Sequence, residues 1–243
     1  MSKITEFVKQ FLLCIGALIH HDHKSKLLYY HDVHGDTHYT PMGTDWEMFA
    51  KHLDIIRQEG FRIVPHIKEA EGEVALLFDD GFRGIYDCRE LFYEQQIRPM
   101  VFLAVSLIGQ PGYLTKEEIL ELQQHGFIFE SHGWSHADMT HFSDKELYKE
   151  LQEARQHLSN LLGKEVTELC LPIGYYSTHV IDKAFEAGYT TIYSSVPGNY
   201  EDLVERMRSR NLLQFSASKE VKMILRGGNT LLRKHYMKLH RRN

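Results

Sequence analysis

Two adjacent carboxylates, Asp79 and Asp80, stand directly after an apolar run in the stretch "LLFDDGFRG". Neighbouring carboxylates repel each other, and burying either one without a partner is costly. Asp and Gly are also common turn residues, so the pair by itself does not separate a turn from a functional site. A bound cation would offset both charges, and the rest of the sequence therefore has to supply its other ligands.

Two histidines, His132 and His136 in "SHGWSHADM", follow another apolar run, "FIFES". An i, i+4 pair can direct two imidazoles at one ion, although a chance pair is unsurprising in a chain with 16 histidines. Together with Asp80 they form a ligand set suited to a first-row divalent metal. Zinc fits this set, and cobalt, nickel or iron would fit as well. Asp79, close to the ion and its water, is then the candidate base.

Short apolar runs alternate with helical patterns along most of the chain. Within each run the residues are apolar one after another and do not alternate with polar residues, which is typical of parallel strands covered on both faces. They occupy residues 27–30, 61–65, 74–78, 100–105, 127–131, 168–172 and 189–195. Helix starts are marked by Asp45 and by the capping boxes at Thr115 and Ser143. This alternation predicts an α/β fold, either a barrel or an open parallel sheet.

The unusual polar residues all follow predicted strands. His31 comes after "LLYY", and Pro172-Ile173-Gly174 comes after "ELCL", just as the acids and the histidine pair follow their own strands. The carboxyl ends of parallel strands meet at one edge, where ligands and catalytic residues gather in such folds. We therefore expect these residues to converge on one mouth.

Three of these segments resemble a known family. "LLFDDG", "SHGWSH" and "LCLPIG" are similar to the first three motifs of the polysaccharide deacetylases (NodB-homology, carbohydrate esterase family 4), over roughly residues 27–195. The resemblance implies a distorted (β/α) barrel with about seven parallel strands, a divalent metal, and hydrolysis of N-acetyl groups on amino sugars. It assigns the base to Asp79, the metal to Asp80, His132 and His136, and oxyanion stabilisation to the Ile173 N–H between Pro172 and Gly174. Trp134 and Tyr175 either line the sugar site or simply pack.

The sequence departs from the family pattern at two points. Cys170 stands where the third motif usually carries an arginine. The sequence therefore shows no evident partner that would adjust the pKa of Asp79. No Leu-x-His motif, the usual source of the general acid, appears near the C-terminus. In a permuted subset similar to the poly-N-acetylglucosamine deacetylases, the acid histidine comes from an N-terminal "YH" segment. "LLYYHDV" fits that arrangement and makes His31 the candidate acid; the alternative is an ordinary histidine at a strand end.

The function we predict is metal-dependent removal of N-acetyl groups from the amino sugars of a polysaccharide or glycan precursor. Two alternatives remain open. The protein is a glycan-binding scaffold that has lost catalysis, as the two departures would allow, or it hydrolyses an amide that is not on a sugar. Glycan length and linkage, and the oligomeric state, are not readable from the sequence.

Composition limits the remaining possibilities. The net charge of −5 gives no basic field for nucleic acid. Cys14, Cys88 and Cys170 show no CxxC spacing, which favours a reducing environment, in the cytoplasm or on the cytoplasmic side of a membrane, with export left open. Residues 1–24 are expected to form an amphipathic helix and loop before one catalytic domain at 25–243. That helix packs on the domain, which we favour, or lies on a membrane surface. The basic tail "LLRKHYMKLHRRN" is interpreted as a solvated end rather than as a site for an anionic surface.

Overall fold

The computed structural model describes residues 3–242, with residues 3–7 as backbone only. Its centre is a curled sheet whose strands run in the order β10-β11-β9-β8-β7-β6-β5-β1-β12, with β4 paired to β5. Every pairing in this sheet is parallel except that of β10 with β11. The strands are β1 (Lys26–Tyr30), β4 (Arg62–Ile63), β5 (Glu73–Phe78), β6 (Met100–Leu103), β7 (Ile128–Ser131), β8 (Glu168–Cys170), β9 (Thr191–Tyr193), β10 (Leu203–Val204), β11 (Met207–Arg208) and β12 (Asn211–Leu212).

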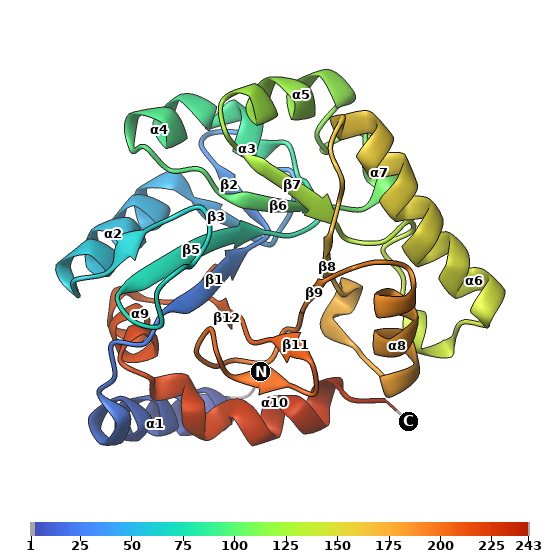
Figure 1. The fold of residues 1–243 in the computed structure, drawn as a ribbon. Helices are drawn as coiled ribbons and strands as arrows, with labels where there is room; N and C mark the ends of the chain where they lie inside the picture. Colours follow the sequence, from blue (N-terminus) through green and yellow to red (C-terminus); the bar gives the residue numbers. More distant parts are fainter. Residues whose placement is uncertain (1–2, 243) are drawn as a thin grey trace.

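Helices surround the outside of this half-barrel, as Figure 1 shows. The longer ones are α2 (Trp46–Gln58), α5 (Lys116–Gln124), α7 (Ala154–Leu162), α8 (Thr178–Glu186), α9 (Ser218–Leu225) and α10 (Arg233–His240), and the short ones are α3 (Gly84–Asp87), α4 (Arg89–Glu94) and α6 (Asp144–Tyr148). Asp45 caps α2 by accepting from the Glu47 and Met48 N–H groups, and capping boxes open α5 and α6 as predicted. The prediction of a barrel-like, mostly parallel α/β fold is confirmed.

The core has two layers because side chains alternate across each strand. Leu27 and Tyr29 of β1 point into the half-barrel with Phe102 and Tyr193, while Leu28 and Tyr30 belong to the larger cluster that includes the helices. All five residues of β1 and all six of β5 are buried. Burial on both faces explains why these strands appear in the sequence as continuous apolar runs.

Some local predictions differ from the structure. The strand expected at 61–65 is reduced to Arg62–Ile63. After the acid pair the chain forms two short helices, α3 and α4. The helix that begins after Ser143 contains a π-helical segment, η3 (Lys149–Glu153), between α6 and α7. A further small sheet, β2 (Asp32–His34) with β3 (Gly43–Asp45), extends from the end of β1.

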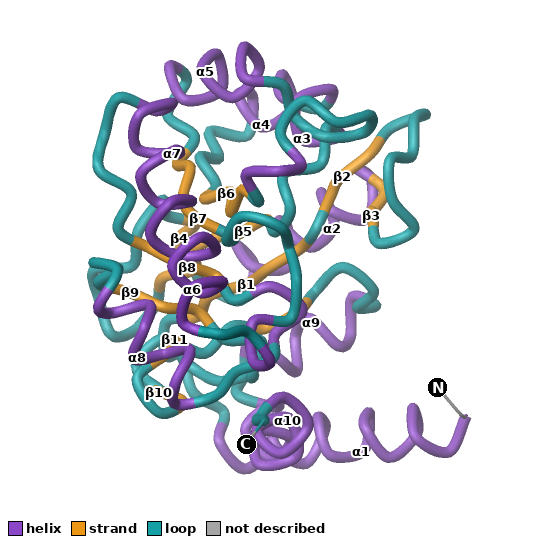
Figure 2. Tube along the Cα trace, turned by 90° about the vertical axis from the view of Figure 1, so that its right-hand side faces the viewer, coloured by secondary structure: helices purple, strands orange, loops and turns teal. Residues whose placement is uncertain are grey.

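The predicted N-terminal helix is present as α1 (Lys3–His20). One face packs against the 3₁₀ segment η5 (Gly228–Leu232) and against α9. The contact with η5 is close, because a Cβ added to Gly16 would lie 2.4 Å from the Gly228 carbonyl oxygen. Figure 2 shows α1 beneath the sheet, with α10 beside it. Among the residues described, no helix is both long and apolar enough to cross a bilayer.

Candidate active site

Strand register brings the predicted residues to one edge of the sheet. Tyr30 of β1 pairs with Phe78 of β5, so the residues that follow them, His31 and Asp79, are neighbours. The Asp79 N–H donates to the Tyr30 carbonyl at 3.0 Å, which continues the ladder past the end of each strand. The His132 N–H donates to Leu103 of β6 in the same way, at 2.8 Å. The expected convergence at the carboxyl ends of the strands is therefore present.

Asp80, His132 and His136 form one cluster. Asp80 Oδ1 lies 3.3 Å from His132 Nε2 and 2.9 Å from His136 Nε2. Asp80 and His132 are buried, whereas His136 is half-buried and leaves the cluster open on one side. The ligand atoms of the three residues lie within 4.8 Å of one another, as donors to a single ion must.

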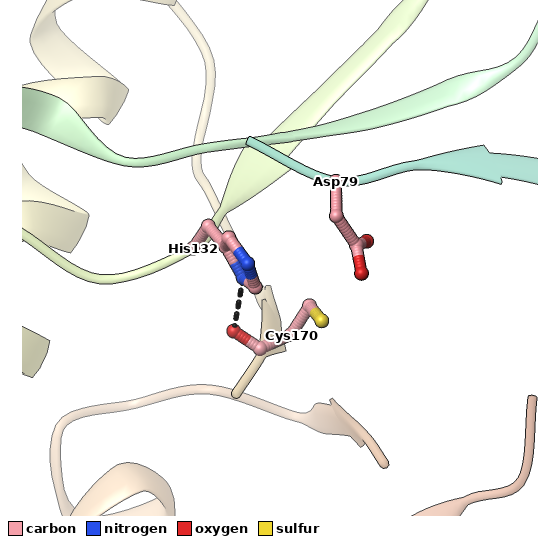
Figure 3. Close-up of side chains that lie close together, drawn as sticks. All are labelled: Asp79, His132 and Cys170. Carbon is pink, nitrogen blue, oxygen red and sulfur yellow. Dashed lines mark hydrogen bonds between the residues drawn. The ribbon is translucent and has the colours of Figure 1, made fainter. Parts of the chain in front are cut away.

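A hydrogen bond from His132 orients its ring. His132 Nδ1 lies 2.8 Å from the Cys170 carbonyl oxygen, which is the bond drawn in Figure 3. A carbonyl only accepts, so Nδ1 carries the proton and Nε2 presents its lone pair to the cluster. Outer hydrogen bonds of this kind fix the tautomer and ring orientation of metal-binding histidines.

The cluster fits a divalent cation. With the His132 Nε2 lone pair directed at it, the buried Asp80 Oδ1 has no hydrogen-bond donor. Two electron-pair donors at this distance repel each other unless a cation or protons lie between them. Burial raises the pKa of Asp80, but the adjacent His132 and His136 imidazoles outweigh burial and hold that pKa far below its usual value. Asp80 is therefore ionised and available as a ligand.

Asp79, His132 and Cys170, the side chains drawn in Figure 3, are a second group whose spacing would suit a metal. This group is the poorer site. Burial raises the pKa of the Cys170 thiol well above its usual value, so the thiol keeps its proton. Both carboxylate oxygens of Asp79 are already engaged by an arginine. The geometry and protonation states favour the Asp80 cluster.

That arginine is Arg210, which directly precedes β12. Its Nη1 donates to Asp79 Oδ1 at 2.7 Å and its Nη2 to Oδ2 at 3.0 Å, and both residues are buried. Its Nε donates to the Ser194 carbonyl, and its guanidinium lies over the Tyr29 ring, 4.2 Å from the centroid. Burial raises the pKa of Asp79, but the Arg210 charge offsets this and the net shift is downward. Asp79 thus has a cationic partner although residue 170 is a cysteine.

The loops that carry the cluster have unusual backbone conformations. Asp80, His136 and Ile173 have φ values of 74°, 59° and 61°. Such left-handed conformations cost on the order of 1–3 kcal/mol for residues other than glycine and gather at functional sites. The i, i+4 histidine pair therefore lies on a loop and not on a helix. Glu150 in the π-helical segment holds this loop, since its Oε2 accepts from the Trp134 and Ser135 N–H groups at 2.9 Å each.

The third motif forms a short turn, η4 (Pro172–Gly174). Ile173 is 49% exposed at its tip. Gly174 has no room for a side chain, because a Cβ would lie 2.7 Å from Ser195 Oγ and 3.0 Å from His240 Nδ1. His240 of α10 therefore reaches the same mouth. Its Nδ1 is buried without a hydrogen-bond partner, and burial together with Arg242 lowers its pKa.

His31 is half-buried, and its Nδ1 lies 2.5 Å from Gln214 Oε1. This contact makes Nδ1 the donor and leaves Nε2 free to serve the site. Of the two candidate sugar platforms, Trp134 packs against the core with Lys149 over its ring and His157 against its side. The Tyr175 ring is covered by the Arg242 guanidinium, at 3.6 Å from the centroid. Contact of either ring with a sugar stays a prediction.

The residues that the sequence did not reveal are Arg210, Gln214, His240 and Glu150. None belongs to a recognisable motif, and Arg210 is separated from Asp79 by 131 positions. Next to Arg210, a cavity of about 320 Å³ is lined by Tyr29 and Ser195, and also by His240 and Leu239 of α10.

Comparison with known proteins shows the family of the chain. The polysaccharide deacetylase family matches residues 66–192, slightly more than half of the chain. The chain therefore belongs to the polysaccharide deacetylase family. A relative, YxkH of Bacillus subtilis (strain 168), which is provisionally named a polysaccharide deacetylase, is 26% identical over 132 residues, covering 54% of this chain and 47% of its own. The chain spans about half the length of the curated relatives it matches.

Two solved structures show the same fold. The Streptococcus pyogenes deacetylase PplD, solved in complex with acetate, superposes with a TM-score of 0.73 at 16% identity, covering 84% of this chain and 99% of that one. IcaB from Ammonifex degensii gives a TM-score of 0.73 at 17% identity, covering 84% and 97%. At these identities the likeness establishes the fold, and the chemistry has to be argued from the residues of this chain.

Proposed function

We propose that this protein is a metal-dependent hydrolase that removes N-acetyl groups from amino sugars of a polysaccharide or glycan precursor. The observation that carries the proposal is the cluster of the buried Asp80 and His132 with the half-buried His136, next to the Asp79–Arg210 pair. Membership of the polysaccharide deacetylase family supports the reaction type. The substrate, the metal and the roles of the individual residues are what we propose.

Asp80, His132 and His136 would hold the ion. When bound, a divalent cation would polarise a carbonyl oxygen and lower the pKa of a coordinated water towards about 7. Zinc suits the one-carboxylate, two-imidazole set, and cobalt, nickel or iron suits it too. Because His132 is oriented by the Cys170 carbonyl and the His136 loop by Glu150, these donors are positioned before any ligand arrives.

The other residues handle protons and the developing charge. Arg210 keeps Asp79 ionised, so that Asp79 accepts the proton of the attacking water. The Ile173 N–H, at the turn after Pro172, stabilises the oxyanion. His31, oriented by Gln214 Oε1, donates a proton to the leaving nitrogen. The products are acetate and a free amino sugar.

The test measures acetate release from N-acetylglucosamine oligomers by the metal-loaded wild-type protein and by the Asp79→Asn variant. The matched control is Asp54→Asn, which changes an exposed carboxylate on α2. We expect turnover in the wild type and in the control, and almost none in Asp79→Asn with its metal retained. A wild-type protein that binds metal and glycan but releases no acetate from any N-acetylated sugar would contradict the proposal. It would favour the binding scaffold, or hydrolysis of another amide.

A further inference from the structure

Helix α1 has two apolar faces, of which only one is packed. Leu13, Gly16 and Ala17 are buried against η5 and α9. The opposite side, here called the outer face of α1, exposes Val8 (48%), Phe11 (56%), Leu18 (75%) and Ile19 (67%). A surface helix normally keeps this side polar, and a helix that is apolar all round is typical of buried or membrane settings. Nothing in the described part of the chain covers the outer face.

The segment that packs beside α1 is strongly basic. Residues 218–243, here called the basic segment, comprise α9, η5 and α10. They contain the cations Lys219, Lys222, Arg226, Arg233, Lys234, Lys238, Arg241 and Arg242 and a single acid, Glu220. The basic segment therefore carries +7, whereas the whole chain carries −5. Lys234 and Lys238 are exposed on α10, near the exposed Leu231 and Leu239.

We propose that the outer face of α1 and the basic segment together form a docking surface for an anionic lipid bilayer. Interfacial helices insert an apolar face to the level of the headgroups while nearby lysines and arginines are attracted to anionic lipids. A second copy of this chain is the poorer occupant, because two surfaces of the same positive charge repel each other when the apolar faces meet. The helix lies on the membrane in this proposal and does not cross it.

Docking in this way would place the catalytic mouth next to the lipid surface. In Figure 2 the N-terminal end of α1 extends on the side toward which β1 continues into β2, which is the side of the strand ends that carry the site. The cavity next to Arg210, the arginine that pairs with Asp79, is lined by Tyr29 and also by Lys9 of α1 and Leu239 of α10. This inference does not depend on the reaction proposed above.

The experiment is co-sedimentation of the full chain with vesicles of phosphatidylcholine alone and of phosphatidylcholine mixed with phosphatidylglycerol. We expect binding to the anionic vesicles and little to the neutral ones. Phe11→Glu with Leu18→Glu should weaken that binding on the order of a hundredfold, because two large apolar side chains are lost from the contact. Lys234→Gln with Lys238→Gln should weaken binding to the anionic vesicles about thirtyfold at low salt. Added salt should reduce the difference in binding between this variant and the wild type.

Matched controls change the same residue types elsewhere. Met48→Glu with Tyr148→Glu alters exposed apolar residues on α2 and α6, and Lys51→Gln with Lys116→Gln alters exposed lysines on α2 and α5. Both controls should bind like the wild type, and circular dichroism should confirm that all variants are folded.

Equal binding to both vesicle types, no binding, or wild-type binding by the α1 variant would overturn the proposal. So would a stable dimer that the α1 variant dissociates, since the outer face would then be covered by a second copy. Acetate release from soluble oligomers should be unchanged in the α1 variant, which keeps this test separate from that of the reaction.

Discussion

Arg210→Met tests the electrostatic design of the site most directly. Arg210 and Asp79 form two hydrogen bonds, of 2.7 and 3.0 Å, and they are only 1% and 3% exposed. Methionine fills much of the arginine stem but removes the charge, so the variant leaves a buried carboxylate with no cationic partner. Breaking a buried ion pair by removing one partner typically costs about 3–5 kcal/mol. We expect the free energy of unfolding of the metal-free protein to fall by about that amount.

The assay is urea denaturation at neutral pH, followed by circular dichroism after the metal has been removed with a chelator. Arg226→Met is the matched control, because Arg226 makes a similar two-pronged contact with Glu59, at 2.7 and 3.1 Å, on the surface. An exposed pair contributes about 0–1 kcal/mol. Asp79→Asn combined with Arg210→Met should recover part of the lost stability, since that double variant buries no unpaired charge.

The reasoning would fail if Arg210→Met lost no more than Arg226→Met, or if the Asp79 and Arg210 substitutions were additive. Either result would mean that water or another cation reaches Asp79, and that the arginine does not keep it ionised. Arg210→Lys should fall between the wild type and Arg210→Met, because lysine keeps the charge but does not reproduce the two-pronged geometry.

Three further predictions concern other side chains. The proposed metal ligands are Asp80, His132 and His136. Alanine at any one of them should greatly reduce the divalent ion found by elemental analysis, while the circular dichroism spectrum stays unchanged. Unchanged metal content in all three variants would rule out this metal site. His31→Ala should keep its metal but lose about 100- to 10,000-fold in turnover; if turnover persists and His240→Ala abolishes it instead, the acid is His240. Burial raises the pKa of Asp32 to about 8, with only partial relief from the Val33 and Ile85 N–H groups. A raised folded-state pKa means that ionisation of Asp32 does not lower the free energy of unfolding below about pH 4 and lowers it progressively as the pH rises to about 8. The free energy of unfolding of Asp32→Asn should therefore rise relative to that of the wild type across that range, by up to about 5 kcal/mol in urea denaturation. A constant difference between pH 4 and pH 8 would show that the Asp32 carboxyl is not desolvated.

The sequence by itself determined the central strands and the residues at their ends. Runs such as "VALLF" and "FIFES" are apolar because both faces are buried, and this requirement is visible in a few consecutive residues. Parallel strands place their carboxyl ends at one edge, so the sequence alone predicts that Asp80 and His132 lie close together. The caps at Asp45 and Thr115 were equally local, since each bonds to a backbone group two or three residues away.

The tertiary structure alone decided which distant side chains complete the site. Arg210 approaches Asp79 because β12, only two residues long, pairs with β1 and directs the preceding side chain into the half-barrel. Glu150 reaches the histidine loop from a π-helical segment, and His240 reaches Gly174 from the last helix. The second apolar face of α1 became evident only when its first face was seen to be packed. These relations depend on how elements dock over long sequence separations, and no short stretch of residues encodes the docking of its distant neighbours.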